Sequence, residues 1–331
     1  MAKACYDVGM ESIKAPYDEL TPDLILNAIE SQGYHCDGHL HPLNSYENRV
    51  YQIGLEEQTP IIAKFYRPQR WTKSAILEEH EFAMELTENE IPIVAPLKNA
   101  QGDTLYEHRG FYYAVYPRCG GRWPDLETKA DRQQMGRFLG RMHAMGASKR
   151  FQHRQSIDIQ RLGYESRETI LSSKLLPEYL IEAYETLSED ILNSIRHKFE
   201  SCYDLRNIRL HGDCHPGNIL WTDAGPHFVD LDDAAMGPAV QDLWMLLSGE
   251  ESEVERQLED YLQGYETFFP FDHSSLILIE PLRTLRLMHY AAWLVRRWHD
   301  PAFPIAFPWF AEPRYWEEHI LSLREQAALL V

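Results

Sequence analysis

A polar run between two short apolar segments is the feature that most constrains how this chain can fold. The run HGDCHPGNIL begins at His211, directly after the strand-like residues 208–210, and a second strand-like piece follows at 227–231. Polar residues at turns between buried apolar strands are where catalytic groups tend to lie. The fold therefore has to place this run at such a turn, and the run is the first candidate for an active site.

Three residues in and after this run suggest its chemistry. Asp213 and Asn218 are five positions apart, and Asp230 follows about a dozen residues later in the sequence VDLDD. Phosphoryl transfer needs a group that orients the attacking hydroxyl and ligands for the metal ions that neutralise the phosphate oxygens. Asp213 suits the first task, whereas the Asn218 amide oxygen and the Asp230 carboxylate are hard ligands of the kind that Mg²⁺ prefers. Because kinases use this order of residues, the sequence predicts a phosphotransferase that uses ATP and Mg²⁺.

Two other interpretations of the same run are open. In an Asx-rich turn, Asp213 and Asn218 would only bond to nearby backbone groups, but three such residues in kinase order between two strands disfavour this. Alternatively, His211, Cys214 and His215 would be metal ligands, but no carboxylate or histidine at helix spacing completes that set. The kinase interpretation is preferred.

A lysine in the strand-like residues 60–66 points to the same chemistry. Lys64 lies in an apolar strand, where a lysine needs an anion to offset its lost hydration. An ATP phosphate and a carboxylate from the next helix would supply it. Glu79, near the start of that helix, is our choice for the carboxylate, with Glu78 as the alternative. The competing interpretation of Lys64 is an edge-strand lysine that faces water.

Residues 113–117, with the sequence YAVYP, fall where the two halves of the chain should join. Backbone groups of this segment could pair with adenine, which makes Tyr116 a candidate nucleotide-binding residue. An ordinary buried strand explains the segment equally well.

Composition limits the class of protein. Of 331 residues, 44% are hydrophobic and 25% are charged, which is enough for a substantial core and about two domains. Acidic residues number 51 and basic residues 32, and the formal charge of −19 would repel a phosphate backbone, so we expect no nucleic-acid partner. The charge favours solubility, or more specifically an acidic groove for a cationic substrate.

Cysteine usage and hydropathy indicate the compartment. The five cysteines are odd in number and widely scattered, which fits a reducing environment. Residues 1–16 lack the order of a signal peptide, and no apolar run approaches the roughly 20 residues needed to cross a bilayer. We therefore expect a cytoplasmic protein without a membrane partner, and we expect it to be a monomer.

The two halves of the chain differ in periodicity. A short amphipathic helix starts at Thr21, and the expected elements that follow are a hairpin at 49–53 and 60–66, a helix at 72–88, and extended pieces at 93–97, 103–106 and 111–116. From about residue 128, helices are expected at about 165–200, 239–269, 274–299 and 313–330. This predicts a bilobal α+β fold: a small antiparallel-sheet lobe, residues 1–117, that binds nucleotide, and a mainly helical catalytic lobe, residues 118–331.

The constellation resembles the aminoglycoside phosphotransferase and choline kinase branch of the protein-kinase-like fold. Within that branch, the chain resembles the bacterial stress response kinase A family over about residues 20–310. The runs that carry this second resemblance are LNSYENRVYQ, KFYRPQRW, LEEHEFA, RLHGDCHPGNILW, VDLDDA, GPAVQDLWMLL and LIEPLRTLRL. The resemblance implies a Ser/Thr protein kinase of the bacterial cytoplasm.

Residue roles follow from this resemblance. It implies that Asp213 accepts the proton, that Asn218 and Asp230 bind Mg²⁺, and that Ser45 lies against ATP in the loop between the first strands. It further implies that Asp242 braces the catalytic loop by hydrogen bonds, although a simple helix N-cap is the alternative there.

The chain also departs from the wider kinase pattern. The first lobe has no G-x-G-x-x-G, only residues 44–49, so a bulkier loop with Ser45 and Arg49 would have to meet the phosphates. No DFG, APE or activation segment lies between Asp230 and Asp242, which gives no support for control by loop phosphorylation.

The preferred function is an ATP- and Mg²⁺-dependent Ser/Thr protein kinase with a role in stress response. Residues 150–200 carry mixed charge and no concentrated acidic lid, which suits a protein acceptor, the kinase itself included, better than a polycationic sugar. The enzyme alternative is a small-molecule kinase for an amino alcohol, sugar or aminoglycoside, because one fold hosts both activities. A non-catalytic ATP-binding scaffold is the third possibility, disfavoured because Lys64, Asp213, Asn218 and Asp230 are all present.

Overall fold

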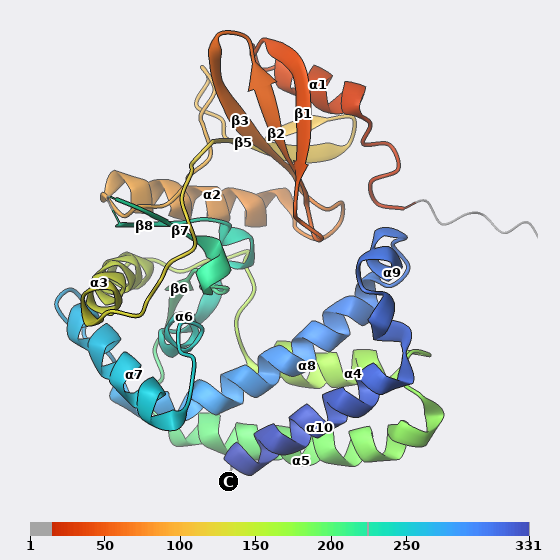
Figure 1. The fold of residues 1–331 in the computed structure, drawn as a ribbon, viewed down its shortest axis with the longest axis vertical. Coiled ribbons are helices and arrows are strands. Elements are labelled where there is room, and N and C mark those ends of the chain that lie inside the picture. The colour runs from red at the N-terminus through yellow and green to blue at the C-terminus, as the bar shows by residue number, and fades with distance from the viewer. Residues whose placement is uncertain (1–14, 224, 331) are drawn as a thin grey trace, which may run out of the picture.

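The computed structural model describes residues 15–223 and 225–330, which form a sheet-rich end and a helical end (Figure 1). The helices are α1 Pro22–Glu30, α2 Lys73–Glu88, α3 Lys129–Gly146, α4 Glu165–Leu171, α5 Ile181–Ser201, α6 Val240–Trp244, α7 Glu251–Tyr265, α8 Ile279–Arg297, α9 Ala302–Ala306 and α10 Pro313–Leu329. The strands are β1 Cys36–Leu43, β2 Arg49–Leu55, β3 Gln58–Phe65, β4 Tyr106–His108, β5 Phe111–Pro117, β6 Asn207–Leu210, β7 Ile219–Thr222, β8 Gly225–Phe228 and β9 Ala235–Pro238. The predicted bilobal α+β fold is confirmed.

The sheet of the first lobe is antiparallel, with strand order β1-β2-β3-β5-β4. Because side chains alternate along a strand, β3 presents Ala63 and Phe65 to the core that α1 covers, and Ile62 and Lys64 to the opposite face. Lys64 pairs with Val50 on β2 and Ala114 on β5, so it lies on a central strand. The edge-strand interpretation of this lysine is therefore wrong.

The helical lobe is built on close contacts between helices, most extensively between α3 and α7. Gly136 and Gly140 on α3 face the backbone of α7, where a Cβ would come within 2.0 Å of the Tyr261 carbonyl oxygen and 2.4 Å of that of Tyr265. Any larger side chain would separate the two helices. This packing supports the small ladders β6–β9 and β7–β8, which flank the polar run.

Several expected boundaries differ in the structure. The hairpin, α1 and α10 are as predicted, but the long helix expected at 239–269 is two helices, α6 and α7. Gly249 takes φ of 99° between them, and Glu250 and Glu253 form a capping box that starts α7. The helix expected at 165–200 is likewise broken, into α4 and α5, around Pro177. Local turn chemistry outweighed the apolar periodicity in both places.

Three strand predictions also need correction, and one strand was not predicted. The piece expected at 227–231 is strand only to Phe228; Asp230 then takes a left-handed conformation, φ 60° and ψ 65°, and residues 231–233 form a 3-10 turn. Strand β1 was not expected, because most of its side chains are exposed and polar and it lies at the sheet edge. Residues 93–97 contain a single bridge, from Ile93 to Phe228, and β4 begins only at Tyr106.

The boundary between lobes after residue 117 stays a prediction. Residues 1–14, on which most of the signal-peptide argument rests, and Cys5 lie outside the described residues. Within the described part of the chain, each helix is too short or too polar to span a bilayer.

Candidate active site

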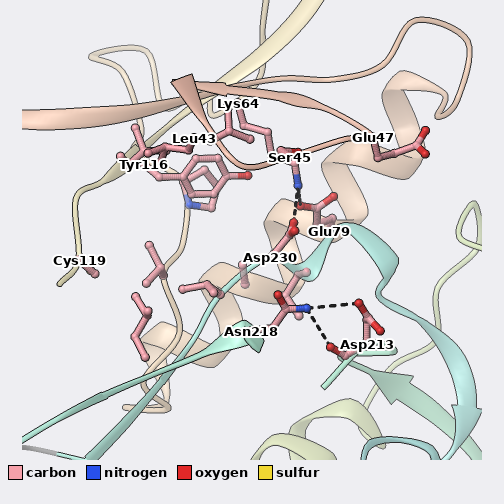
Figure 2. Close-up of a pocket in the computed structure, with 18 of the residues that line it drawn as sticks. Leu43, Ser45, Glu47, Lys64, Glu79, Tyr116, Cys119, Asp213, Asn218 and Asp230 are labelled. Atoms are coloured by element: carbon pink, nitrogen blue, oxygen red, sulfur yellow. Dashed lines mark hydrogen bonds and ion pairs between the residues drawn. The ribbon is translucent and has the colours of Figure 1, made fainter. Parts of the chain in front are cut away.

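One cavity of about 590 Å³ lies between the sheet of the first lobe and the polar run of the second (Figure 2). It brings together all of the site residues predicted from the sequence, namely Ser45, Lys64, Glu79, Tyr116, Asp213, Asn218 and Asp230. These residues come from six separate segments of the chain, so the fold itself assembles the site.

Lys64 is the charged centre of the cavity's inner wall. Its Nζ lies 3.0 Å from Asp230 Oδ1, 3.0 Å from Asp232 Oδ1 and 3.5 Å from Glu79 Oε1. Burial alone would lower the pKa of Lys64, but the three carboxylates outweigh it and raise the pKa well above its ordinary value. The lysine is therefore charged and available to a phosphate.

Glu79 and Glu78 have different partners. Glu79 is buried on α2, between Lys64 and Arg154, whose Nη1 lies 3.4 Å from Glu79 Oε2. Glu78 points elsewhere: its carboxylate accepts hydrogen bonds from the backbone N–H groups of residues 152–154, at 2.6 to 3.0 Å. Of the two, Glu79 is thus the one that pairs with Lys64.

The turn that carries Asp213 is held from behind by Asp242. The Asp242 carboxylate accepts hydrogen bonds from the backbone N–H groups of His211 and Gly212, both at 2.8 Å, and lies 3.1 Å from His143 Nε2. Gly212 has φ of 85°, and a Cβ there would lie 2.2 Å from the Asp233 carbonyl oxygen. The expectation that Asp242 braces this loop is confirmed.

Asp213 lies at the cavity with three neighbours. Arg286 on α8 places Nη1 2.5 Å from Asp213 Oδ1, His215 Nε2 lies 3.5 Å from Oδ2, and the Asn218 side-chain amide donates to the Asp213 carbonyl oxygen at 2.9 Å. Burial alone would raise the pKa of Asp213, but His215 and Arg286 outweigh it and hold the pKa well below its usual range. The carboxylate is therefore ionised at neutral pH.

Asn218 and Asp230 form a donor set that fits a divalent cation. Because the Asn218 Nδ2 group bonds to Asp213, the amide oxygen is left to face the cavity (Figure 2). Asp230 exposes about half of its side chain, 53%, and is brought there by its left-handed backbone. An amide and a carboxylate oxygen suit Mg²⁺. The alternative set does not form: His211 bonds the Val229 carbonyl, and the described residues hold no cluster of three or more His, Cys, Asp or Glu arranged for a metal.

Tyr116 closes one end of the cavity. Its hydroxyl lies 3.1 Å from that of Tyr66, which in turn lies 2.7 Å from His80 Nε2, and His80 Nδ1 is 2.9 Å from the Thr104 hydroxyl. This buried chain of hydrogen bonds fixes the ring of Tyr116. Apolar side chains complete this part of the wall, with room for a flat ring system: Val50, Ile62, Val94, Leu220 and Val229.

The loop with Ser45 is fixed by an ion-pair cluster that sequence reasoning missed. Glu47 accepts hydrogen bonds from Trp293 Nε1 at 2.5 Å and Arg297 Nη2 at 2.8 Å, both on α8 of the other lobe. These contacts fix the loop over the cavity that Ser45 lines. Arg49 does not line the cavity, contrary to expectation, because its guanidinium lies over the ring of Tyr17, 4.4 Å from the centroid.

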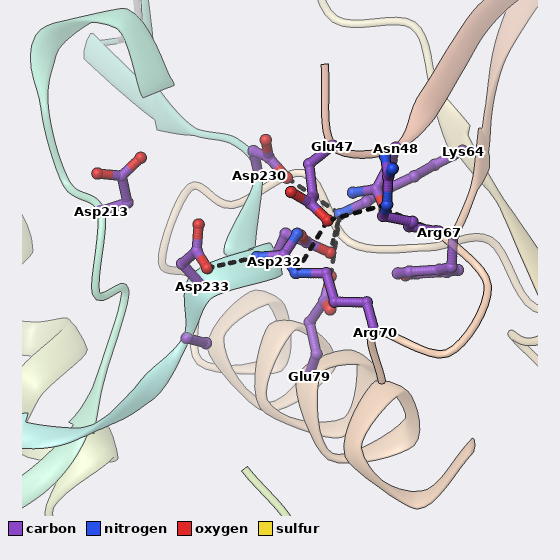
Figure 3. A network of polar contacts seen from close by, with 12 residues as sticks. Glu47, Asn48, Lys64, Arg67, Arg70, Glu79, Asp213, Asp230, Asp232 and Asp233 are labelled. Atoms are coloured by element: carbon purple, nitrogen blue, oxygen red, sulfur yellow. Dashed lines mark hydrogen bonds and ion pairs between the residues drawn. The ribbon is translucent and has the colours of Figure 1, made fainter. Parts of the chain in front are cut away.

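The same cluster extends to the acidic turn after β8 (Figure 3). Arg70 forms ion pairs with Asp232 and, at 2.7 Å, with Asp233, and its Nε lies 3.7 Å from Glu47. Burial alone would raise the pKa of Asp232, but Arg70 and Lys64 outweigh it and hold the pKa far below the usual range. Only the spacing VDLDD could have signalled this, and it does not reveal the partner. Because Asp232 is buried between Lys64 and Arg70, whereas Asp230 is half exposed and lines the cavity, Asp230 is the better placed of the two to bind a metal ion.

Comparison with known proteins agrees with this geometry. The profile of the phosphotransferase enzyme family matches residues 39–278. Stress response kinase A of Escherichia coli K12 is 46% identical over 314 residues, which cover 95% of this chain and 94% of that protein. A relative from Salmonella typhimurium named serine/threonine protein kinase RdoA is 44% identical over the same extent.

Solved structures with the same fold are more distant in sequence. The amicoumacin kinase hAmiN, in complex with AMP-PNP, Ca²⁺ and Ami, has a TM-score of 0.68 at 20% identity and covers 95% of this chain and 96% of its own. A microcompartment-associated aminopropanol kinase has a TM-score of 0.67 at 18% identity and covers 93% of this chain and 96% of its own. At such identities the likeness shows the fold alone.

Proposed function

Because the chain belongs to the phosphotransferase enzyme family, and within it to the stress response kinase A family, we propose that it transfers the γ-phosphate of ATP to a Ser or Thr hydroxyl of a protein. The main support for this proposal is that one cavity is lined by four residues suited to phosphate transfer, Lys64, Asp213, Asn218 and Asp230. A role in a bacterial stress response is supported by the relatives' names.

The proposed mechanism gives each of these residues one task. Lys64 holds a phosphate oxygen, with Glu79 keeping the ammonium group in place. Ionised Asp213 accepts the proton of the acceptor hydroxyl as that oxygen attacks the γ-phosphorus and the bond to ADP breaks. Asn218 and Asp230 would hold Mg²⁺, which neutralises phosphate charge when bound. We place adenine against Tyr116 and the phosphates beneath the Ser45 loop.

A protein acceptor is favoured over a small alcohol on sequence identity. The relatives that are 44–46% identical across almost the whole chain include one named as a Ser/Thr protein kinase. The two solved small-molecule kinases named above are 20% and 18% identical and show the fold alone. We further propose that the enzyme acts as a monomer in the cytoplasm, and that its nucleotide-binding lobe ends near residue 117.

Incubation with γ-labelled ATP and Mg²⁺ tests this function. Purified enzyme, alone and with a dephosphorylated bacterial extract, should give labelled protein, and acid hydrolysis should release phosphoserine or phosphothreonine without phosphotyrosine. The Asp213→Asn variant is the control with impaired transfer, and it should label protein at least about 100-fold more slowly than the wild type. Labelling of an amino alcohol or aminoglycoside at an ordinary rate, with no labelled protein, would contradict the proposal in favour of a small-molecule kinase.

A further inference from the structure

A second cavity, of about 570 Å³, adjoins the active site and has the opposite charge to the chain as a whole. The two cavities share Trp293, and Asp233 of the acidic turn lines the second one. Its charged lining consists of the guanidinium groups of Arg67, Arg70, Arg161, Arg296 and Arg297 and the carboxylates of Asp233 and Glu165. We call it the arginine pocket. In a chain with a formal charge of −19, such a concentration of arginines calls for a local explanation.

Two of these arginines have no carboxylate partner. Arg67, Arg70 and Arg297 all form ion pairs within the protein. Arg161 instead donates to the Ser156 carbonyl and the Gln155 amide oxygen, and Arg296 donates to the Thr169 hydroxyl at 3.2 Å. Within the part of the chain that the structure describes, no carboxylate oxygen comes within 4.0 Å of either guanidinium.

Burial destabilises the charged form of these two guanidinium groups. It lowers the pKa of Arg161 even though Asp233 and Asp158 pull the other way, and it lowers the pKa of Arg296, with the neighbouring charge of Arg297 adding to the effect. Glu165, which lines the same pocket, also acts against the lowering at both arginines, but its carboxylate is not in contact with either guanidinium. A partly buried cation that no carboxylate contacts is stabilised when a ligand brings an anion into contact with it.

His289 on α8 lines the same pocket, close enough to these arginines for their charges to act on it. Burial, followed by the charges of Arg161, Arg296 and Arg286, lowers the pKa of His289 to about 3, so the ring is neutral. Its Nδ1 lies 3.3 Å from the Ser166 hydroxyl. Burial is the largest cause, but the arginine charges act in the same direction, as expected of a pocket that favours an incoming negative charge.

Helix α8 links the arginine pocket to Asp213. Arg286, His289, Trp293 and Arg296 follow one another at helical spacings of three, four and three residues, and therefore share a face. Arg286 forms an ion pair with Asp213. Arg296 lies ten residues after Arg286, which is about 15 Å along the helix axis. An extended peptide covers that distance in about four or five residues.

We propose that the arginine pocket binds an acidic side chain of the acceptor protein, about four or five residues from the Ser or Thr that receives the phosphate. This proposal rests on the proposed protein-kinase function. It adds a substrate class: acceptor sites next to Glu or Asp, and not next to Lys or Arg. It also disfavours cationic amino alcohols and aminoglycosides, because their ammonium groups would meet the unpaired guanidinium groups of Arg161 and Arg296.

A binding measurement separates this inference from phosphate transfer. Fluorescent peptides in which Ala replaces the acceptor Ser, with Glu, Gln or Lys four and five positions to either side, are titrated with the enzyme in the presence of Mg·ADP. Fluorescence anisotropy should show the Glu peptides binding about 10- to 100-fold more tightly than the Lys peptides. Equal affinity for the Glu and Lys peptides would overturn the inference whether or not the enzyme is a kinase.

Variants locate the effect. Arg161→Gln with Arg296→Gln should remove the preference for Glu peptides, whereas Arg314→Gln, an exposed arginine of α10 paired only with Glu318, should retain it. Urea denaturation confirms that each variant folds. In kinetics with Ser peptides, the double variant should raise KM for the Glu peptide and leave kcat and the KM for ATP within about twofold. A double variant that keeps the full preference would contradict the proposed site.

Two further outcomes distinguish the two proposals. Preferential binding of Glu peptides without phosphate transfer to their Ser forms would support the pocket and contradict the protein-kinase function. Phosphorylation of glycerol phosphate, used as a small anionic alcohol, with no binding of any acidic peptide would overturn the peptide occupant.

Discussion

Replacing Glu47 by Gln tests whether the loop that carries Ser45 binds ATP. The Glu47 carboxylate accepts from Trp293 Nε1 and from both Nε and Nη2 of Arg297, at 2.5 to 3.2 Å, and its side chain is only 13% exposed. The amide has a similar shape but only one acceptor oxygen, so one charge-assisted hydrogen bond to Arg297 is lost. Such a bond contributes about 1–2 kcal/mol more than a neutral one, and we therefore expect a 5- to 30-fold weaker affinity for ATP.

The assay is calorimetric titration with Mg·ATP, together with KM and kcat for phosphate transfer. The Glu47→Gln variant should raise the Kd and KM for ATP and change kcat less, because the loop positions nucleotide without taking part in proton transfer. Glu56→Gln, at an exposed position in the β2–β3 turn, is the matched control. If Glu47→Gln lowers the free energy of unfolding while the affinity for ATP stays at the wild-type value, the cluster only joins the lobes and the reasoning is refuted.

Three further predictions concern the proposed metal ligand Asp230, the carboxylate of Asp242 that holds the catalytic turn, and the buried His80. Asp230→Ala should weaken the Mg²⁺-dependent affinity for ATP by about 100-fold or more in calorimetry, because without the bound metal the triphosphate would be repelled by Asp232 and Asp233. An unchanged affinity would point to Asp232 as the metal ligand. Asp242→Asn should lower the free energy of unfolding in urea by about 2–4 kcal/mol and should also lower kcat, because the amide cannot accept from both backbone N–H groups. The control Asp204→Asn, at an exposed position, should change neither quantity. Burial lowers the pKa of His80 to about 3, so its contribution to stability is full above pH 6.5 and is lost as the pH falls toward 3. The free energy of unfolding should therefore fall less steeply between pH 6.5 and pH 4 in His80→Gln than in the wild type. A wild-type slope in this variant would contradict the prediction.

The catalytic turn was the most predictable part of the molecule. Asp213, Asn218 and Asp230 lie next to short apolar strands, and their order and spacing along the chain were enough to predict that their side chains meet at one cavity. The pairing of Lys64 with Glu79 also followed, because a strand and the next helix pack against each other.

What the sequence could not give depends on contacts between distant residues. Glu47 and Arg297 are 250 positions apart, and Asp213 meets Arg286 only because the fold brings α8 next to the polar run. Charged residues of this kind look like surface residues in a single sequence, since neither partner shows an unusual local pattern. Strand β1 was missed for the related reason that an exposed edge strand need not be apolar.

The rate of phosphate transfer by Asp213→Asn tests the central claim most directly. The amide keeps the shape of the turn, so affinity for Mg·ATP should stay close to the wild-type value. The free energy of unfolding should fall only by the contribution of the ion pair with Arg286, and the variant should remain folded. Single-turnover transfer at saturating Mg·ATP should fall by roughly 10²- to 10⁴-fold, the usual contribution of a positioned general base. Transfer at the wild-type rate, with binding intact, would remove Asp213 from the chemistry and contradict the account.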